Sequence, residues 1–173
     1  EIEGIHNRTD FDLQRHQAAS GKKLEYFEPA TNERFVPFII ETSAGADRVT
    51  LTTLVDAYRE EQVEGETRVV LGFHPSIAPI KAGVFPLVKK DGMPEFATRL
   101  YHDLKRQVPA FYDDSGAVGR RYRRMDEAGT PFCITVDGQT LQDGTVTVRH
   151  RDAMNQDRVA ADTLAAWIKE RTG

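Results

Sequence analysis

The segment 41–48 (E-T-S-A-G-A-D-R) combines residue types that can bind a small ligand carrying negative charge. It leaves an apolar stretch, passes through small residues and one glycine, and enters a helical pattern. Backbone amides at such a turn and the positive end of the helix favour an anion, and Arg48 could reach a phosphate or stack on a flat ring. The segment lacks the second glycine and the lysine of a P-loop. An ordinary strand-to-helix turn, in which Ser43 caps the helix and Asp47 complements its dipole, stays open.

Two carboxylates at the start of the chain form a second candidate site. Glu1 and Glu3 flank Ile2, so in a strand both acidic side chains lie on the same side. Carboxylates are hard oxygen ligands of the kind that Mg²⁺ binds. The alternative is the solvated face of an edge strand.

A basic cluster in the second half of the chain could bind RNA. It consists of Arg120, Arg121, Arg123 and Arg124. Helical spacing places the first, third and fourth of these on one face, beside Tyr122. Guanidinium groups bind phosphates and stack on bases. A solvated face whose arginines pair with neighbouring acidic residues is an equally open interpretation.

Several kinds of chemistry are not expected. The five histidines show no metal-ligand spacing, and with a single cysteine, Cys133, a zinc site is not predicted. One cysteine also fits a reducing, cytoplasmic compartment. No apolar run approaches the roughly 20 residues of a membrane-spanning helix, so we expect no membrane partner.

The charge distribution predicts two domains. Residues 1–66 carry 7 Lys/Arg and 14 Asp/Glu, whereas residues 67–173 carry 16 and 13. We therefore place a linker at residues 61–67, between a domain of residues 1–60 and a second domain of residues 68–173.

Local patterns predict the elements that position these candidates. In the first half we expect a helix at 10–20, strands at 25–27 and 34–41, and a helix at 49–58. The second half alternates between strands and helices, with strands at 68–73, 111–113, 132–136 and 145–149, helices at 94–108 and 119–128, and a last helix capped by Asp157. The predicted fold class is α/β.

Several strings resemble a known family. The strings E-I-E-G-I-H-N-R-T-D-F-D-L, N-E-R-F-V-P-F-I-I-E-T-S-A-G-A-D-R and L-V-D-A-Y are similar to those of the bacterial, homodimeric type of glycyl-tRNA synthetase, a class II aminoacyl-tRNA synthetase. The resemblance covers essentially the whole chain and is most specific in residues 1–58. It implies ATP-dependent activation of glycine and transfer of glycine to tRNA(Gly) in protein synthesis.

The resemblance also implies site residues. Arg48 and Glu41 would be catalytic, and the glycine substrate would meet Glu41, Thr42, Ser43, Ala44 and Gly45. ATP would contact Glu1, Ile2, Gly45, Ala46, Asp47 and Arg48, with Glu1 also near Mg²⁺. Two departures from the family pattern, Thr42 for proline and His6 for alanine, remove no charged ligand.

The rest of the chain resembles the anticodon-binding domain shared by several class II synthetases. The expected fold is therefore a remnant of the antiparallel catalytic sheet, followed by a mixed sheet flanked by helices. The four arginines of residues 120–124, together with Arg149 and Arg151, are the candidate tRNA contacts. Motifs 1 and 2 of class II enzymes are not found, so we expect a C-terminal part that is inactive alone and dimeric in the full-length enzyme. A non-catalytic tRNA-binding paralogue is the alternative, and an unrelated nucleotide-binding α/β protein a third.

Overall fold

The structure is a computed structural model and describes residues 2–173, so Glu1 lies outside the described residues. The chain divides into two compact units, Glu1–Thr52 and Thr53–Gly173. The division falls within helix α2 (Ala46–Ala57). This boundary is earlier in the chain than the expected linker at residues 61–67.

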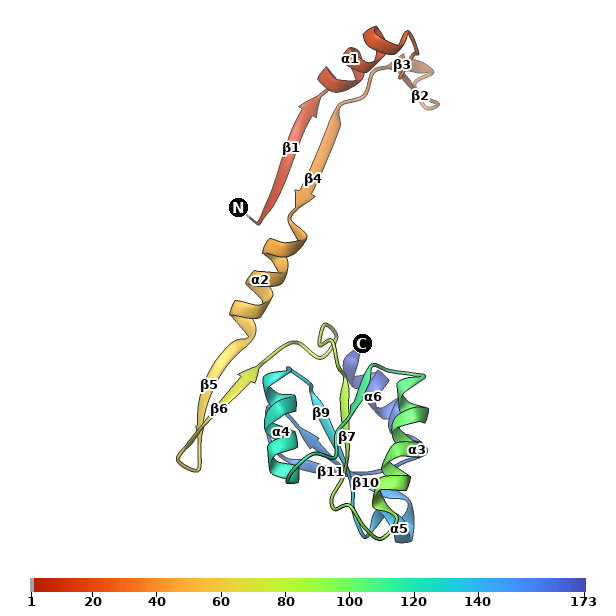
Figure 1. Ribbon diagram of the computed structural model, residues 1–173. Helices are drawn as coiled ribbons and strands as arrows, with labels where there is room; N and C mark the ends of the chain where they lie inside the picture. Colours follow the sequence, from red (N-terminus) through yellow and green to blue (C-terminus); the bar gives the residue numbers. More distant parts are fainter. Residues whose placement is uncertain (1) are drawn as a thin grey trace. The chain divides into compact units, whose positions relative to one another are not determined.

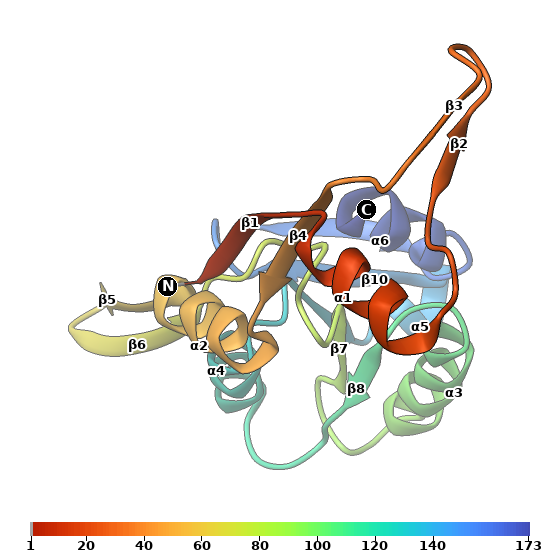
Figure 2. The same ribbon diagram turned by 90° about the horizontal axis from the view of Figure 1, so that it is seen from above.

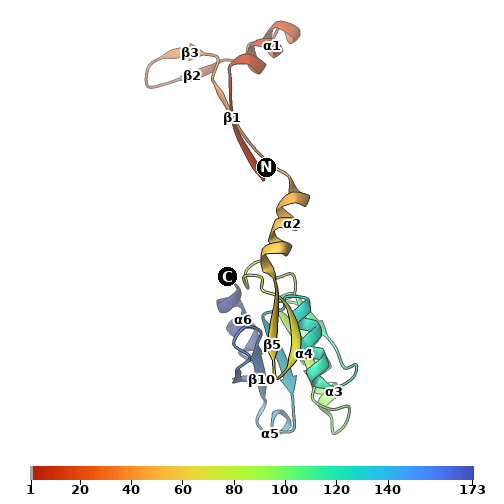
Figure 3. The same cartoon turned by 90° about the vertical axis from the view of Figure 1, so that its left-hand side faces the viewer.

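The first unit contains two short antiparallel ribbons. Strand β1 (Glu3–Thr9) pairs with β4 (Ile39–Ala44), and β2 (Tyr26–Glu28) pairs with β3 (Glu33–Phe35). Helix α1 (Phe11–Ser20) and the β2–β3 hairpin lie at one end of the β1–β4 ribbon (Figure 3). The expected helix at 10–20 is confirmed, including its end at Gly21, whose φ of 69° is the left-handed conformation that glycine adopts freely.

The strand expected at 34–41 is interrupted. Strand β3 ends at Phe35 and β4 begins at Ile39, because Pro37 between them has no N–H to donate to a partner strand. Phe38 and Ile40, although apolar, are 63% and 62% exposed in this chain.

The predicted linker is instead part of a hairpin in the second unit. Strand β5 (Tyr58–Val63) and β6 (Glu66–Leu71) pair antiparallel along their length, with Glu64 and Gly65 at the turn. The acidic residues that suggested a linker lie on a β-hairpin, whose exposed positions solvate charge as well as a linker would.

A five-stranded mixed sheet forms the centre of the second unit, in the order β11-β10-β9-β7-β8. Its strands are β7 (Ala82–Pro86), β8 (Ala110–Tyr112), β9 (Phe132–Val136), β10 (Thr145–His150) and β11 (Gln156–Ala160). Strand β7 is parallel to β8 and β9, whereas β10 is antiparallel to β9 and β11. The helices are α3 (Met93–Lys105), α4 (Val118–Glu127), α5 (Thr140–Asp143) and α6 (Leu164–Thr172). The prediction of a mixed sheet flanked by helices is confirmed.

Two separate apolar cores lie on opposite faces of this sheet. Helices α3 and α6 cover one face through Leu104, Leu164 and Ile168, whereas α4 covers the other, where Met125 meets Phe85. Figures 1 and 2 show α3 and α4 on opposite sides of β7. Because strand residues alternate between faces, β7 supplies both cores.

The C-terminal helix begins later than expected. Asp157, predicted as its cap, lies in β11, where it is paired with Val148 of β10, and α6 starts at Leu164. No helix among residues 2–173 is long and apolar enough to cross a membrane.

Candidate functional site

The pairing of β1 with β4 brings the two candidate segments of the first unit side by side. Glu41 lies opposite His6, and Ser43 lies opposite Gly4. Residues directly opposite one another share a face, and neighbours in one strand point to opposite faces. Glu41 and Ser43 therefore share one face, whereas Thr42 and Ala44 share the other with Glu3. The strand separates the expected glycine-binding residues into two sets.

Arg8 fixes the position of Glu41. Its Nη1 lies 3.3 Å from Oε2 of Glu41, and its Nε lies 2.6 Å from Oδ2 of Asp12. The hydrogen bond from Arg8 lowers the pKa of Asp12 and raises the pKa of Arg8 itself. This link between β1, α1 and β4 was not predicted, because the register of two strands distant in sequence cannot be read from either one alone.

Gly45 connects β4 to helix α2. The N–H of Val49 donates to the carbonyl oxygen of Gly45 at 2.9 Å, which closes the first helical turn. A Cβ at Gly45 would meet only Cβ of Arg48, at 3.5 Å, an ordinary contact. The glycine is therefore not required by the local packing, and its small size leaves the start of α2 open. Ala46, Asp47 and Arg48 lie in the first turn of α2, the positive end of the helix dipole.

The described residues do not form a metal site on their own. Among residues 2–173 there is no group of three His, Cys, Asp or Glu side chains that could hold a metal ion. Glu3 lies on the ribbon face opposite to Glu41, and Glu1, the expected Mg²⁺ contact, is outside the described residues. Mg²⁺ usually keeps several waters and binds through one or two carboxylates together with substrate phosphates, so it does not require a cluster of three protein ligands.

The expected arginine cluster divides into buried and exposed members. Arg121 is 2% exposed and donates to the carbonyl oxygens of Pro86 and Gly116, both at 2.5 Å. It fixes the loop before α4 to the end of β7. The expectation that Arg121 contacts RNA is therefore corrected: its guanidinium is used inside the protein.

The remaining three arginines lie on the outer part of α4. Arg124 donates to Asp113 at 2.9 Å and to the carbonyl oxygen of Ser115 at 2.7 Å. Arg123 lies 3.8 Å from Glu66 of the β5–β6 hairpin. Arg120 is exposed, and no carboxylate lies within ion-pairing distance of it in the described part of the chain. Arg120 is therefore the exposed cation of the cluster without a carboxylate partner in the described chain, whereas Arg123 is half-buried and Arg124 is exposed but paired with Asp113.

The other two candidate arginines are held inside the second unit. Arg151 is 3% exposed and donates to the carbonyl oxygens of Phe73 and Gly129 at 2.8 and 2.9 Å. It has a structural role, which corrects its expected role in RNA contact. Arg149 is 8% exposed and donates to both oxygens of Asp126, at 3.0 and 3.2 Å.

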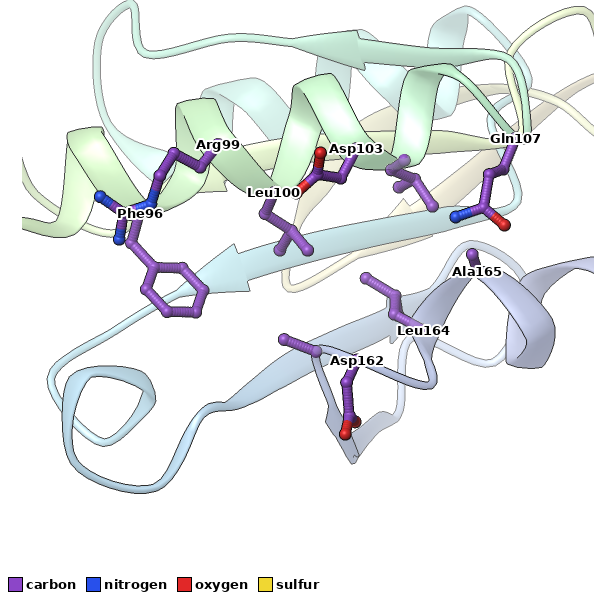
Figure 4. A pocket seen from close by; sticks show the side chains of 10 residues that line it. Phe96, Arg99, Leu100, Asp103, Gln107, Asp162, Leu164 and Ala165 are labelled. Carbon is purple, nitrogen blue, oxygen red and sulfur yellow. The ribbon is translucent and has the colours of Figure 1, made fainter.

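A cleft lies on the opposite face of the sheet from α4, between α3 and the start of α6. It has a volume of about 340 Å³. Figure 4 shows Phe96 and Leu100 of α3 facing Leu164, with Asp103 and Asp162 on either side. None of the expected site residues lines it, so the cleft and the arginine cluster are separate features.

The comparisons with known proteins agree with this geometry. Residues 81–171 match the family model described as an anticodon-binding domain. The matched segment contains the five-stranded sheet and the helices α3, α4 and α6.

Individual relatives extend the similarity to both units. The chain is 52% identical over 168 residues to the glycine–tRNA ligase of Chlorobaculum tepidum, covering 97% of the chain and 36% of that relative. It is 53% identical over 171 residues to the glycine–tRNA ligase of Caldanaerobacter subterraneus, and the alignment covers 99% of the chain and 37% of that relative. The chain thus spans little more than a third of the length of these relatives. Because the family match covers more than half of the 173 residues, the chain belongs to the anticodon-binding domain family.

Proposed function

We propose that this chain is the C-terminal part of a glycine–tRNA ligase, an enzyme that activates glycine with ATP and transfers it to tRNA(Gly). The observation that carries this proposal is the identity of about half of all positions with proteins of that name, which extends over 97–99% of the chain. The similarity therefore includes the first unit as well as the anticodon-binding domain.

In this proposal the second unit binds the anticodon loop of the tRNA. Single-stranded RNA bases are read by stacking and by hydrogen bonds to base edges, whereas arginines fix the phosphates. Arg120 is exposed and Arg123 is half-buried on the outer side of α4, and both would contact phosphates. Arg124 shares that side and also fixes the loop that contains Asp113.

The first unit would bind glycine and ATP. Glu41, oriented by Arg8, offers a carboxylate to the ammonium group of glycine, and Ser43 lies on the same face of the ribbon. Because glycine has no side chain, the complete site would have to reject larger amino acids by steric clash. Arg48, in the first turn of α2, would contact the phosphates of ATP.

ATP and Mg²⁺ are the cofactors of this proposal. Bound ATP would supply the adenylyl group that activates the carboxylate of glycine, with pyrophosphate as the leaving group, and bound Mg²⁺ would offset the negative charge of the phosphates. Of the residues in this chain, Arg48 and the amides of residues 45–47 would contact ATP, together with Glu1 and Ile2, which precede strand β1 in the sequence. We propose that the chain alone is inactive, because charged groups on the other side of the ATP would have to come from sequence outside it. The loss of one preorganised charge contact typically costs about 10²- to 10³-fold in rate.

The oligomeric state and the compartment follow the family in this proposal. The complete enzyme would be a homodimer in the cytoplasm. The single cysteine, Cys133, fits a reducing compartment.

The test is glycine-dependent exchange of pyrophosphate into ATP. The full-length protein should catalyse this exchange, the Arg48→Ala variant of it should not, and the 173-residue chain should give only background. Absence of exchange by the full-length protein, together with retained binding of tRNA(Gly), would support a non-catalytic paralogue instead. Clear exchange by the 173-residue chain would contradict the proposal that the chain lacks part of the ATP site.

A further inference from the structure

One segment of the first unit has a charge opposite to that of its surroundings. Residues 13–24 contain Arg15, Lys22 and Lys23 together with His16, and no Asp or Glu. Residues 1–66 as a whole carry twice as many acidic as basic residues, 14 against 7. The segment is therefore a basic patch in an acidic half of the chain.

The end of α1 folds this segment back upon the helix. The N–H of Gly21 donates to the carbonyl oxygen of Gln17 at 2.9 Å, and the N–H of Leu24 donates to Oε1 of Gln17 at 2.7 Å. These bonds return Lys22 and Leu24 to the side of the helix that carries Arg15. The result is an open hollow of about 670 Å³ that is lined by Arg15, His16, Ala19, Ser20, Lys22 and Leu24.

The positive charges around this hollow are not neutralised within the described chain. Arg8, a few residues earlier, is paired with Asp12 and Glu41. By contrast, no carboxylate of residues 2–173 forms an ion pair with Arg15, Lys22 or Lys23. Arg15 instead makes a cation–π contact with Phe11, whose ring centroid lies 5.1 Å from the guanidinium carbon. The hollow thus combines unpaired cations with an apolar floor at Ala19 and Leu24.

Such a surface fits the sugar–phosphate backbone of a nucleic acid. Lysine and arginine side chains bind backbone phosphates and release condensed counterions, which provides affinity without sequence readout. The apolar floor can pack against the carbon faces of riboses, which a small inorganic anion does not present. Charge complementarity therefore favours RNA over an acidic metabolite.

We propose that this hollow binds backbone phosphates of the acceptor arm of tRNA. The inference depends on the proposed function, because the unit that carries Glu41 and Arg48 would have to meet the 3′ end of the tRNA, where glycine is attached. The binding site is distinct from the arginines of α4, since Arg15 and Lys22 belong to the first unit and α4 to the second.

The experiment uses two RNA hairpins and the complete 173-residue chain. One hairpin reproduces the acceptor stem of tRNA(Gly) with its single-stranded 3′ end, and the other reproduces the anticodon stem and loop. Binding of each is measured by fluorescence anisotropy over a range of salt concentrations. The test variant is Arg15→Gln/Lys22→Gln. The matched control is Lys105→Gln/Arg106→Gln, which removes the same charge from an exposed site at the end of α3.

We expect the Arg15→Gln/Lys22→Gln variant to bind the acceptor hairpin about tenfold more weakly, with a salt slope reduced by about 1.8. The control variant and the anticodon hairpin should show neither change. Equal affinity of the test variant and the unsubstituted chain for the acceptor hairpin would overturn the inference, as would an equal loss in the control. Failure of the unsubstituted chain to bind the anticodon hairpin would count against the proposed function instead.

Discussion

Nε of Arg68 lies 2.8 Å from Oδ2 of Asp126, and both side chains are 0% exposed. Arg149 donates to the same carboxylate from the sheet, at 3.0 Å, and Glu61 accepts from Arg68 at 2.7 Å. One carboxylate of α4 thus joins the β5–β6 hairpin to the central sheet. This buried cluster, rather than apolar packing alone, makes the hairpin part of the anticodon-binding unit.

Replacing Asp126 with asparagine should destabilise the second unit strongly. The substitution leaves the guanidinium groups of Arg68 and Arg149 buried with much less compensating charge. Breaking a buried ion pair in this way costs about 3–5 kcal/mol of unfolding free energy. Trp167, the single tryptophan, lies in α6, so its fluorescence during urea unfolding reports on this unit.

Asp157→Asn is the matched control for this substitution. Its carboxylate is 48% exposed and pairs with His150 at 2.8 Å, and such exposed pairs contribute about 0–1 kcal/mol. If Asp126→Asn lowered the free energy of unfolding no more than the control does, the buried cluster would not stabilise the fold.

Truncation tests whether the hairpin belongs to the second unit. A chain of residues 53–173 should unfold cooperatively, because it retains both hairpin strands and the complete charge cluster. A chain of residues 68–173 should be clearly less stable, since it removes β5 and with it Glu61, one of the carboxylate partners of Arg68. Urea midpoints of the two chains provide the measurement. Equal midpoints would instead favour a domain that begins at residue 68.

The sequence predicted elements better than it predicted their contacts. Helix α4 was expected at 119–128 and is found at Val118–Glu127, and it ends at Gly129, whose φ is 75°. A Cβ at Gly129 would lie 2.4 Å from the ring of Phe73, so this position requires glycine. Local rules of helix capping are sufficient for such an element.

Strand β7 and the role of Asp126 could not be predicted in the same way. The sequence of β7, A-G-V-F-P, contains a glycine and a proline and is only 5 residues long, although it is the strand between β8 and β9. By local spacing alone, Asp126 is one of the acidic neighbours that could pair with the α4 arginines on a solvated face. Its true partner Arg68 is 58 residues away in the chain, and only the tertiary fold brings them together.

Low pH should remove a stabilising contribution from Asp137. The hydrogen bond from Arg158 is the largest cause that lowers the pKa of Asp137, and it outweighs the opposing effect of burial. Because the folded pKa lies below the unfolded value of about 4, the contribution is complete above that pH. It is lost as the pH falls through the folded pKa. Asp137→Asn should therefore lose less stability between pH 6 and pH 3 than the unsubstituted chain.

The measurement is the urea midpoint at both pH values, with Asp91→Asn as the control. Asp91 is 63% exposed and its nearest cation, Lys90, is 3.9 Å away. Between pH 6 and pH 3, the urea midpoint of the control should fall by as much as that of the unsubstituted chain. An identical change in Asp137→Asn would mean that other carboxylates determine the acid sensitivity.

Cys133 should react with a thiol reagent only when the second unit opens. The side chain is 1% exposed, and burial raises the pKa of its thiol to about 12, with a further contribution from Asp126. The thiolate is the reactive form, so the folded protein should be inert at pH 8. In Asp126→Asn, the rate should rise by about 10²- to 10⁴-fold, as expected for a loss of 3–5 kcal/mol when opening is fast. Rapid reaction of the folded chain would contradict the burial of this strand.

The arginines on the outer side of α4 should contribute to binding of the anticodon hairpin. Arg120 and Arg123 are the suitable pair, because Arg121 and Arg124 also hold the loop before the helix. In Arg120→Gln/Arg123→Gln we expect weaker binding of the anticodon hairpin and a salt slope smaller by about 1.8, since two phosphate contacts are removed. Binding of the acceptor hairpin should not change, because α4 and the hollow beside α1 lie in different units. The Lys105→Gln/Arg106→Gln control separates a local contact from a general effect of charge. An unchanged affinity and slope in the α4 variant would assign these arginines to a solvated surface, and the anticodon loop would then have to bind elsewhere on the second unit.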